Sequence, residues 1–186
     1  RATPADIELS QRCGAQGVVI EIPCGEPKLK YQFSKWSQED IIRRSAETVA
    51  CAKEAGLYTV YFPYDTTRAD VDFLDRLLGE VMERARPDGV GVVDTTGCLL
   101  PQAMEVLVRR VRKLTGAEVE VHTHNDLGMG IATTLAAIGA GSTVAHVSVN
   151  ALGERSGNAS LDEVVVSLMA LYGLKTNIRF KKLEEV

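Results

Sequence analysis

Residues 119–130 read VEVHTHNDLGMG. The first part of this stretch alternates valine with polar side chains, a pattern typical of a β-strand with one face buried. Asn125 and Asp126 belong to the residue types that cap the start of a helix, and Gly128 and Gly130 allow tight backbone turns. The stretch therefore predicts a strand that passes through a short loop into a helix.

Four further runs rich in Val, Ile and Tyr share this character, which gives five expected strands: residues 17–23, 58–62, 89–94, 118–122 and 143–149. Helical patterns lie between and after these strands. Strands that alternate with helices, without a polar linker or a break in composition, predict one α/β unit with a parallel sheet.

Helix boundaries are marked by capping residues. Ser37 with Asp40 predicts the start of a helix that ends at Gly56. Ser160 with Glu163 predicts a capping box at the start of the last helix.

Two architectures fit this pattern: a doubly wound open sheet that is complete in itself, or a segment of an eight-stranded barrel. Periodicity does not separate them. The chain begins with Arg1 rather than Met, has a helical pattern before its first strand, and ends in a charged stretch at residues 181–185. These features favour the barrel segment.

Composition excludes several classes of protein. The chain has 186 residues, 45% of them hydrophobic and 25% charged, which is ordinary for a globular protein. It has neither a membrane-spanning apolar run nor a signal-peptide pattern, so a cytoplasmic protein without membrane contact is expected. A net charge of -4 argues against nucleic acid as a partner. The basic run at residues 109–113 shares its helix with apolar residues at helical spacing and is expected to form a solvated outer face.

The four cysteines stand far apart, at Cys13, Cys24, Cys51 and Cys98, with no CxxC pair. Reduced thiols are therefore expected rather than a zinc knuckle or disulfides. Cys98 follows an expected strand and is an alternative candidate as a catalytic thiol, although no general base is visibly placed beside it.

His122 and His124 stand two residues apart at the end of a strand. Such side chains share a face, with Cα atoms roughly 6.5 to 7 Å apart, so both imidazoles can bind one ion at about 2.0 to 2.2 Å per bond. Both candidate architectures place their sites at this end of the strands. The pair is a candidate metal site, and hydrogen-bonded structural histidines are the alternative.

Longer motifs carry a resemblance to a known family. HTHNDLGMG at residues 122–130 resembles the HxHND signature of the 2-isopropylmalate and homocitrate synthases, a family that shares its barrel and metal site with 3-hydroxy-3-methylglutaryl-CoA lyase. GERSGNASLDE at residues 153–163 is similar to the family's GERxGNxxLEE segment. DTTG at residues 94–97 with Pro101 resembles its DTVG…P turn, and PYDTTR at residues 63–68 resembles its PED-containing turn.

This resemblance implies a (β/α)₈ TIM barrel, of which residues 1–186 cover about the fourth to eighth strands as a single catalytic-domain segment. In the family the first three strands supply an Arg-Asp pair that includes a third metal ligand. The chain is therefore expected to be truncated at both ends.

The resemblance also implies roles for matching residues. His122 and His124 would bind the divalent ion, and Asn158 would lie beside or in its coordination shell. Thr95 would hydrogen-bond the carboxylate of a 2-oxo acid; a hydroxyl that satisfies a strand end is the alternative. Residues 154–155, Glu-Arg, are as readily a structural ion pair at the barrel mouth as a direct contact to substrate.

Three departures from the family concern the substrate pocket. Tyr64 stands where the family usually has Glu, and His146 stands where its last strand has an acidic residue. A hydrogen-bonded histidine is the simpler interpretation of His146. The loop at residues 24–31 lacks the serine and histidine common in the isopropylmalate branch, so the resemblance does not imply leucine biosynthesis.

The function that the resemblance implies is a condensation of acetyl-CoA with a 2-oxo acid by an acyltransferase of amino-acid biosynthesis. Its cofactor would be a divalent ion, Mg²⁺, Mn²⁺ or Zn²⁺, and the complete protein is expected to be a homodimer. A metal-dependent carbon-carbon lyase or aldolase is one alternative, and an inactive half-barrel that acts as a binding module is another.

Overall fold

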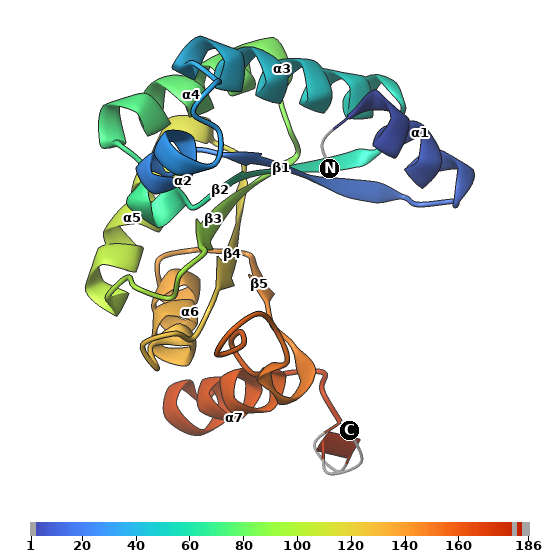
Figure 1. Cartoon of the computed structure of the whole chain (residues 1–186). Coiled ribbons are helices and arrows are strands. Elements are labelled where there is room, and N and C mark those ends of the chain that lie inside the picture. The colour runs from blue at the N-terminus through green and yellow to red at the C-terminus, as the bar shows by residue number, and fades with distance from the viewer. Residues whose placement is uncertain (1–2, 180–181, 184–186) are drawn as a thin grey trace.

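The strands form one parallel sheet. A computed structural model describes residues 3–179 and 182–183, and its five strands are β1 (Gly17–Pro23), β2 (Tyr58–Tyr64), β3 (Gly89–Asp94), β4 (Glu118–Thr123) and β5 (Val144–His146). They lie side by side in the order of the sequence, with all neighbours parallel (Figure 1). A doubly wound sheet reverses its strand order at one point. This sheet does not, so the prediction of a partial barrel is confirmed.

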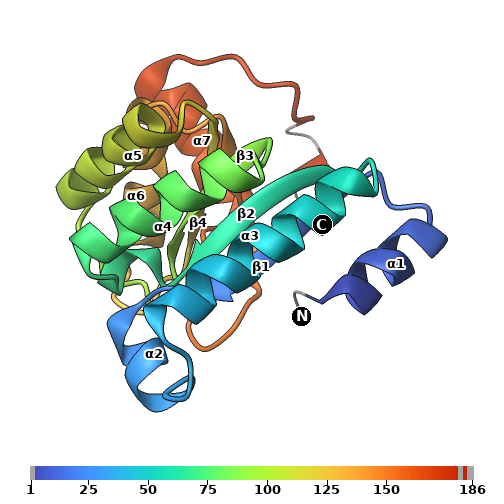
Figure 2. The ribbon, with the colours of Figure 1, turned by 90° about the horizontal axis from the view of Figure 1, so that it is seen from above.

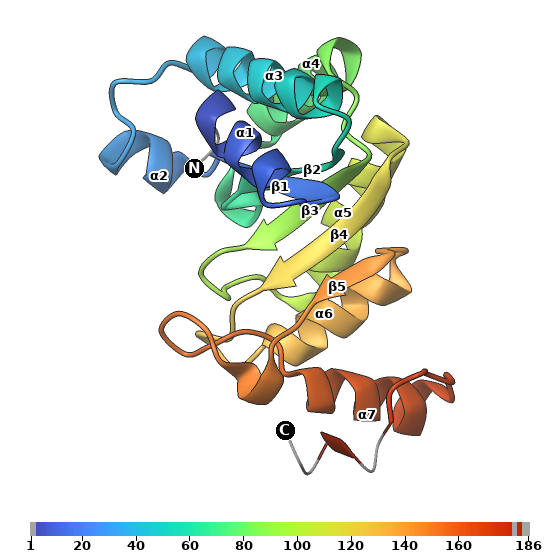
Figure 3. The ribbon, with the colours of Figure 1, turned by 90° about the vertical axis from the view of Figure 1, so that its right-hand side faces the viewer.

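The helices cover the outside of this curved sheet. The helical elements are α1 (Pro4–Arg12), α2 (Glu26–Tyr31), α3 (Gln38–Glu54), α4 (Val71–Arg84), α5 (Pro101–Thr115), α6 (Gly130–Gly139) and α7 (Leu161–Tyr172), with 3₁₀ turns η1 (Thr66–Arg68) and η2 (Val149–Ala151). From α3 to α7 each helix contacts the next, and α3, α5 and α6 pack on the strands (Figures 2 and 3). The short helix α2 instead lies beyond the carboxyl ends of the strands (Figure 3). The opposite face of the sheet is left for the barrel interior.

The capping prediction is right at one helix and wrong at another. Ser37 and Asp40 form the expected capping box at the start of α3, each side chain accepting from the other residue's backbone N–H. At α7, Ser160 is the N-cap residue but makes no capping bond to the helix, because its hydroxyl contacts the Asp162 carboxylate instead. Glu163 is exposed, so the predicted Ser160–Glu163 capping box is absent.

Two other predictions of local structure need correction. The last strand covers only Val144–His146 of the predicted residues 143–149. Beyond it, the Ser148 N–H donates to the Ala159 carbonyl at 3.0 Å, which draws the chain out of the sheet and into η2. The segment at residues 24–31, interpreted above as a loop, contains the short helix α2.

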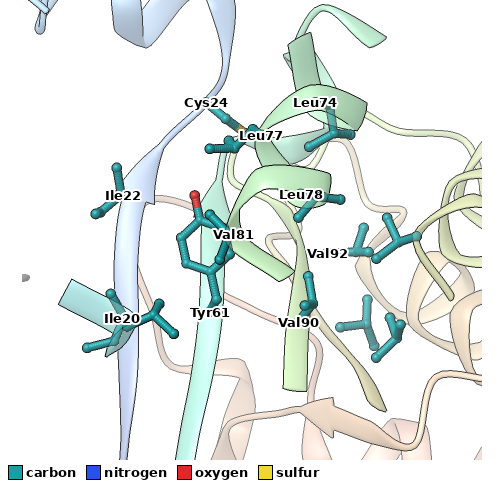
Figure 4. Packing of buried hydrophobic residues seen from close by; sticks show 14 of the residues in the cluster. Ile20, Ile22, Cys24, Tyr61, Leu74, Leu77, Leu78, Val81, Val90 and Val92 are labelled. Carbon is teal, nitrogen blue, oxygen red and sulfur yellow. The ribbon is translucent and has the colours of Figure 1, made fainter. Parts of the chain in front are cut away.

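Apolar side chains form two separate layers. The main layer lies between the strands and the outer helices. Ten of its members are labelled in Figure 4: Ile20, Ile22, Cys24, Tyr61, Leu74, Leu77, Leu78, Val81, Val90 and Val92. The smaller layer lies on the other sheet face and consists of Val60, Phe62 and Val93, with Tyr64 against it. Because strand side chains alternate between faces, the second layer marks the barrel interior.

The basic run at residues 109–113 lies on the solvated outer surface, as expected from its helical spacing with apolar residues. The basic residues of the run at residues 109–113 are exposed on α5, and Arg110 pairs with Asp75 of α4. Among the helices of residues 3–179 and 182–183, none combines the length and the apolar character needed to cross a bilayer. Lys181, Glu184 and Glu185 of the charged terminal stretch lie outside the described residues.

Candidate metal and substrate site

His122 and His124 converge at the end of β4. Their Nε2 atoms lie 3.3 Å apart, and their ring planes are nearly perpendicular at 81°. Two nitrogen ligands on one ion, each at about 2.0 to 2.1 Å, lie roughly 2.8 to 3.4 Å from each other at octahedral or tetrahedral angles. The separation also suits an N–H···N hydrogen bond between neutral rings. The geometry therefore accommodates an ion bound at both Nε2 atoms without movement of either ring.

Both imidazoles are held in the form that binds metal. Burial lowers the pKa of His122 to about 4, with smaller contributions from the neighbouring His124 and His146. Burial and the nearby Arg155 guanidinium lower the pKa of His124 as well. A neutral imidazole has a free ring nitrogen to offer as a ligand. At neutral pH the pair therefore meets the protonation requirement of a metal site.

Asn158 lies next to the two histidines because its backbone forms a β-bridge with that of His124. Asn158 and His124 face each other as an isolated antiparallel bridge, flanked by a hydrogen bond from Asn125 N to Gly157 O at 3.0 Å. Cross-strand partners project side chains to the same face of the pairing. Gly153 leaves room there, since a Cβ at that position would come within 2.8 Å of the Asn158 amide.

Two atoms of this group lack partners. Asn158 Oδ1 and His124 Nδ1 are buried without a hydrogen bond. Buried polar atoms are normally satisfied, and each exception costs about 1 to 3 kcal/mol. An oxygen of this kind beside two neutral imidazoles fits a divalent ion, so the donors present are chemically suited to one. In the described part of the chain, however, no three His, Cys, Asp or Glu side chains group together as a complete set of ligands.

Thr95 lies at the end of β3 and plays the structural role considered as its alternative. Its hydroxyl oxygen accepts a hydrogen bond from the backbone N–H of Asp65 at 2.8 Å, which ties the turns after β2 and β3 together. The hydroxyl proton is not used in that bond and remains available to a ligand. The two roles of Thr95 are therefore compatible.

The neighbouring carboxylates organise the turns. Asp65 is fully buried and forms a two-bond pair with Arg68, at 2.7 and 2.8 Å. Asp94 accepts from the Thr67 hydroxyl at 2.9 Å and from the backbone N–H groups of Cys98 and Leu99 at 3.2 and 3.1 Å. Both carboxylates are thus engaged in holding the loops that carry Thr95 and its surroundings.

Arg155 joins three loops at the mouth of the sheet. Its guanidinium donates to both Asp126 carboxylate oxygens at 2.7 and 2.9 Å and to the Thr95 carbonyl at 2.7 Å, and it approaches Glu154 at 3.3 Å. The Glu154–Arg155 ion pair considered from the sequence is therefore present, but Asp126 is the stronger partner. Asn125 and Asp126 were both expected to cap α6. Only Asn125 contacts the start of this helix, accepting from Gly130 N at 2.9 Å, and the N-cap residue itself is Met129, which has no capping side chain.

Replacing Arg155 by lysine is expected to lower the free energy of unfolding by about 1 kcal/mol. A lysine keeps the charge but cannot form the two parallel bonds to Asp126 together with the bond to the Thr95 carbonyl. Chemical denaturation measures the effect. Arg43→Lys on α3 is the control, because its exposed pairs with Asp40 and Glu47 are worth little, and equal losses in both variants would contradict the role of Arg155.

The sequence-predicted residues line one cavity of about 430 Å³: Thr95, His122, His124 and Asn158. The remaining lining residues are Glu21, Lys28, Tyr64, Val93, Gly153 and Glu154. Sequence reasoning missed Glu21 and Lys28 as site residues. A charged residue inside the apolar run VVIEIP at residues 18–23 was the signal that could have indicated Glu21.

The two departures from the family motif both lie on the interior side. Tyr64 lines the cavity, and burial, followed by the nearby Glu21 and Asp65 carboxylates, raises its pKa to about 12. His146 Nε2 lies 2.7 Å from the buried Glu120 carboxylate, and its ring packs against Phe62. His146 is therefore hydrogen-bonded, in accordance with the simpler interpretation.

The cysteines are free thiols. Cys98 is exposed, and its Sγ atom contacts the Thr96 hydroxyl at 3.3 Å and the Asp94 carboxylate at 3.8 Å. Within the described residues no imidazole hydrogen-bonds this thiol, so the structure gives no support to the alternative of a catalytic Cys98.

Similar proteins are synthases of the expected kind. The chain is 40% identical over its whole length to an (R)-citramalate synthase and 38% identical to a 2-isopropylmalate synthase, both of Methanocaldococcus jannaschii. It is 35% identical to a homocitrate synthase of Methanopyrus kandleri. The chain spans 38%, 36% and 46% of the lengths of these three relatives.

The fold also matches solved structures. An HMG-CoA lyase of Acinetobacter baumannii, in complex with coenzyme A and 3-methylmalate, superposes with a TM-score of 0.83 at 17% identity. The match covers 99% of this chain and 63% of the lyase chain, and at that identity it establishes the fold. The family model described as HMGL-like matches residues 1–186. The chain therefore belongs to the HMGL-like family.

Proposed function

We propose that the protein containing this chain condenses acetyl-CoA with a 2-oxo acid at a divalent-metal site held by His122, His124 and Asn158. The observation that carries this proposal is the cavity in which the two converging imidazoles, the unpartnered Asn158 oxygen and the Thr95 hydroxyl come together. The relatives named as synthases of citramalate, 2-isopropylmalate and homocitrate support the same reaction class.

Each side chain of the cavity has a part in binding or orientation. His122, His124 and Asn158 would hold the divalent ion, which would supply Lewis acidity toward the ketone of a 2-oxo acid. The Thr95 hydroxyl is placed to donate its free proton to the substrate carboxylate, because its oxygen is already fixed by Asp65 N. Two imidazoles joined by hard oxygen ligands from substrate and water would suit Mg²⁺, Mn²⁺ or Zn²⁺.

The loop at residues 153–158 favours synthesis over cleavage. The related lyases carry a longer loop with a reactive cysteine before the equivalent Ser-Gly-Asn, and this sequence has no cysteine after Cys98. A carbon-carbon lyase on the same metal site remains the second candidate, because the neighbouring solved structure is named an HMG-CoA lyase. The homodimer and the cytoplasmic location stay predictions from the resemblance.

A panel of 2-oxo acids with acetyl-CoA and Mn²⁺ is expected to show release of free CoA thiol with at least one acid. Full-length protein is the sample, since the chain spans less than half of each relative compared. Cleavage of a 3-hydroxyacyl-CoA, without CoA release from any acid, would favour the lyase. Absence of both reactions and of metal binding would favour an inactive binding module.

A further inference from the structure

If the protein condenses acetyl-CoA with a 2-oxo acid, as proposed above, the reaction needs a general base. The methyl group of acetyl-CoA must lose a proton before its carbon can attack a ketone. General bases contribute about 100- to 10,000-fold to such a rate and must reach the proton directly or through one water. Carboxylates are the natural candidates in this cavity, because both imidazoles are assigned as ligands.

Most carboxylates near the site already have partners. Asp65 is paired with Arg68, and Asp94 accepts from the Thr67 hydroxyl and from backbone N–H groups of the turn after β3. Glu120 lies 2.7 Å from His146 and does not line the cavity. None of these three carboxylates lines the cavity, and each is engaged in contacts that organise the fold.

Two further cavity residues are poorly suited to be the base. The Glu154 carboxylate lies 3.3 Å from the Arg155 guanidinium, whereas Glu21 makes no such ion pair in the described part of the chain. Tyr64 keeps its proton, since its pKa of about 12 lies far above neutral pH. A protonated phenol can donate a hydrogen bond but cannot remove a proton from carbon.

Glu21 is the remaining carboxylate of the cavity. It lies in β1 beside Phe62 of β2, and both residues belong to strand positions that face the barrel interior. Its neighbours Ile20 and Ile22 are buried on the opposite, helix-covered face. In the described part of the chain the Glu21 side chain has neither a hydrogen bond nor an ion pair, so its oxygens are free for a ligand.

We propose that Glu21 is the general base of the condensation. Its carboxylate takes a proton from the acetyl methyl group, and the C–H electron pair becomes the enolate of the thioester. The enolate carbon forms the new bond to the ketone carbon of the 2-oxo acid, whose C=O π pair moves to oxygen and is protonated. Water then cleaves the thioester, which releases the carboxylic acid and CoA.

Glu21→Gln in the full-length protein is expected to lower kcat for CoA release by about 100-fold or more, because the amide cannot accept the proton. The KM for the 2-oxo acid and the affinity for Mn²⁺ should stay within about threefold of wild type. With trideuterated acetyl-CoA, the isotope effect on kcat should increase, since proton removal becomes slower than every other step. Glu21→Asp, which keeps a carboxylate, should recover part of the rate.

Glu105→Gln on the outer helix α5 is the matched control and should leave both the rate and the isotope effect unchanged. A Glu21→Gln rate within about threefold of wild type would overturn the assignment, as would a large loss with an unchanged isotope effect. The assignment would also be overturned if Glu154→Gln, rather than Glu21→Gln, made proton removal slow and raised the isotope effect on kcat. If wild type releases no CoA with any 2-oxo acid, the proposed function itself fails, and Glu21 loses its assigned role with it.

Discussion

His122→Ala and His124→Ala, each made in the full-length protein, are expected to weaken Mn²⁺ or Zn²⁺ binding by more than about 100-fold. Loss of even an outer partner of a metal ligand weakens binding by about 10- to 100-fold, so loss of a ligand should cost more. Turnover should fall by roughly 100- to 1,000-fold or further, the range seen when one group that stabilises developing charge is removed. Calorimetric metal titration and steady-state rates measure the two effects.

The same variants should remain folded. The His124 ring is buried and its Nδ1 atom has no partner, so its removal also removes an unsatisfied polar atom. The His122 ring contacts other imidazoles rather than the main apolar layer. Removal of the ring leaves a cavity, which destabilises the protein, but it also removes the unsatisfied Nδ1 atom, which stabilises it. Because these two effects oppose each other, the free energy of unfolding without metal should change by less than about 1 kcal/mol for His124→Ala.

His146→Ala is the control that separates ligands from structural histidines. It leaves the buried Glu120 carboxylate without its hydrogen-bond partner, and a buried polar group left without a partner costs about 1 to 3 kcal/mol. We expect it to destabilise the protein more than His124→Ala does, and to reduce metal affinity less than tenfold. Unchanged metal affinity and turnover in His122→Ala and His124→Ala would show that these histidines are structural and that the assignment of the site is wrong.

Most of the fold could be predicted because its signals are local. Alternating apolar residues and the Ser37–Asp40 capping box need only neighbouring residues to act, and the structure has the expected strands and the start of α3. The Ser160 prediction failed because a competing acceptor, Asp162, lies two residues away. The last strand ended early because Ser148 found a partner, Ala159, in a loop that periodicity does not describe.

The site also contains residues that local spacing predicts and residues whose positions depend on contacts between distant segments. The HxH spacing on one strand was sufficient to predict that His122 and His124 share a face, and their Nε2 atoms do converge. Glu21 came from a different strand, and its position depends on the register between β1 and β2, which the sequence does not encode locally. The Arg155–Asp126 pair likewise joins two loops 29 residues apart in sequence.

The loop that carries Asn158 contains several residues in the left-handed backbone region. Asn150, Ala151 and Arg155 all have positive φ angles of 53 to 54°, which non-glycine residues rarely adopt. Gly157 has φ +84°, and a Cβ there would lie only 2.0 Å from the Ala151 carbonyl oxygen. The same carbonyl accepts the Asn158 N–H at 3.1 Å, so the position of the Asn158 amide depends on the absence of a side chain at Gly157.

Gly157→Ala is therefore expected to lower the free energy of unfolding by about 3 kcal/mol or more. About 1 to 2 kcal/mol comes from forcing an L-residue into the left-handed region, and the remainder comes from the contact with the Ala151 carbonyl. If the loop moves to relieve that contact, the stability loss is smaller but Asn158 is displaced, and metal affinity should fall about tenfold.

Gly79→Ala in α4 is the matched control: a Cβ there meets nothing within 4 Å, and alanine should stabilise the helix by about 0.5 to 1 kcal/mol. Thermal denaturation and metal titration of both variants give the comparison, and a Gly157→Ala protein as stable and as metal-competent as Gly79→Ala would refute the dependence of Asn158 on this glycine.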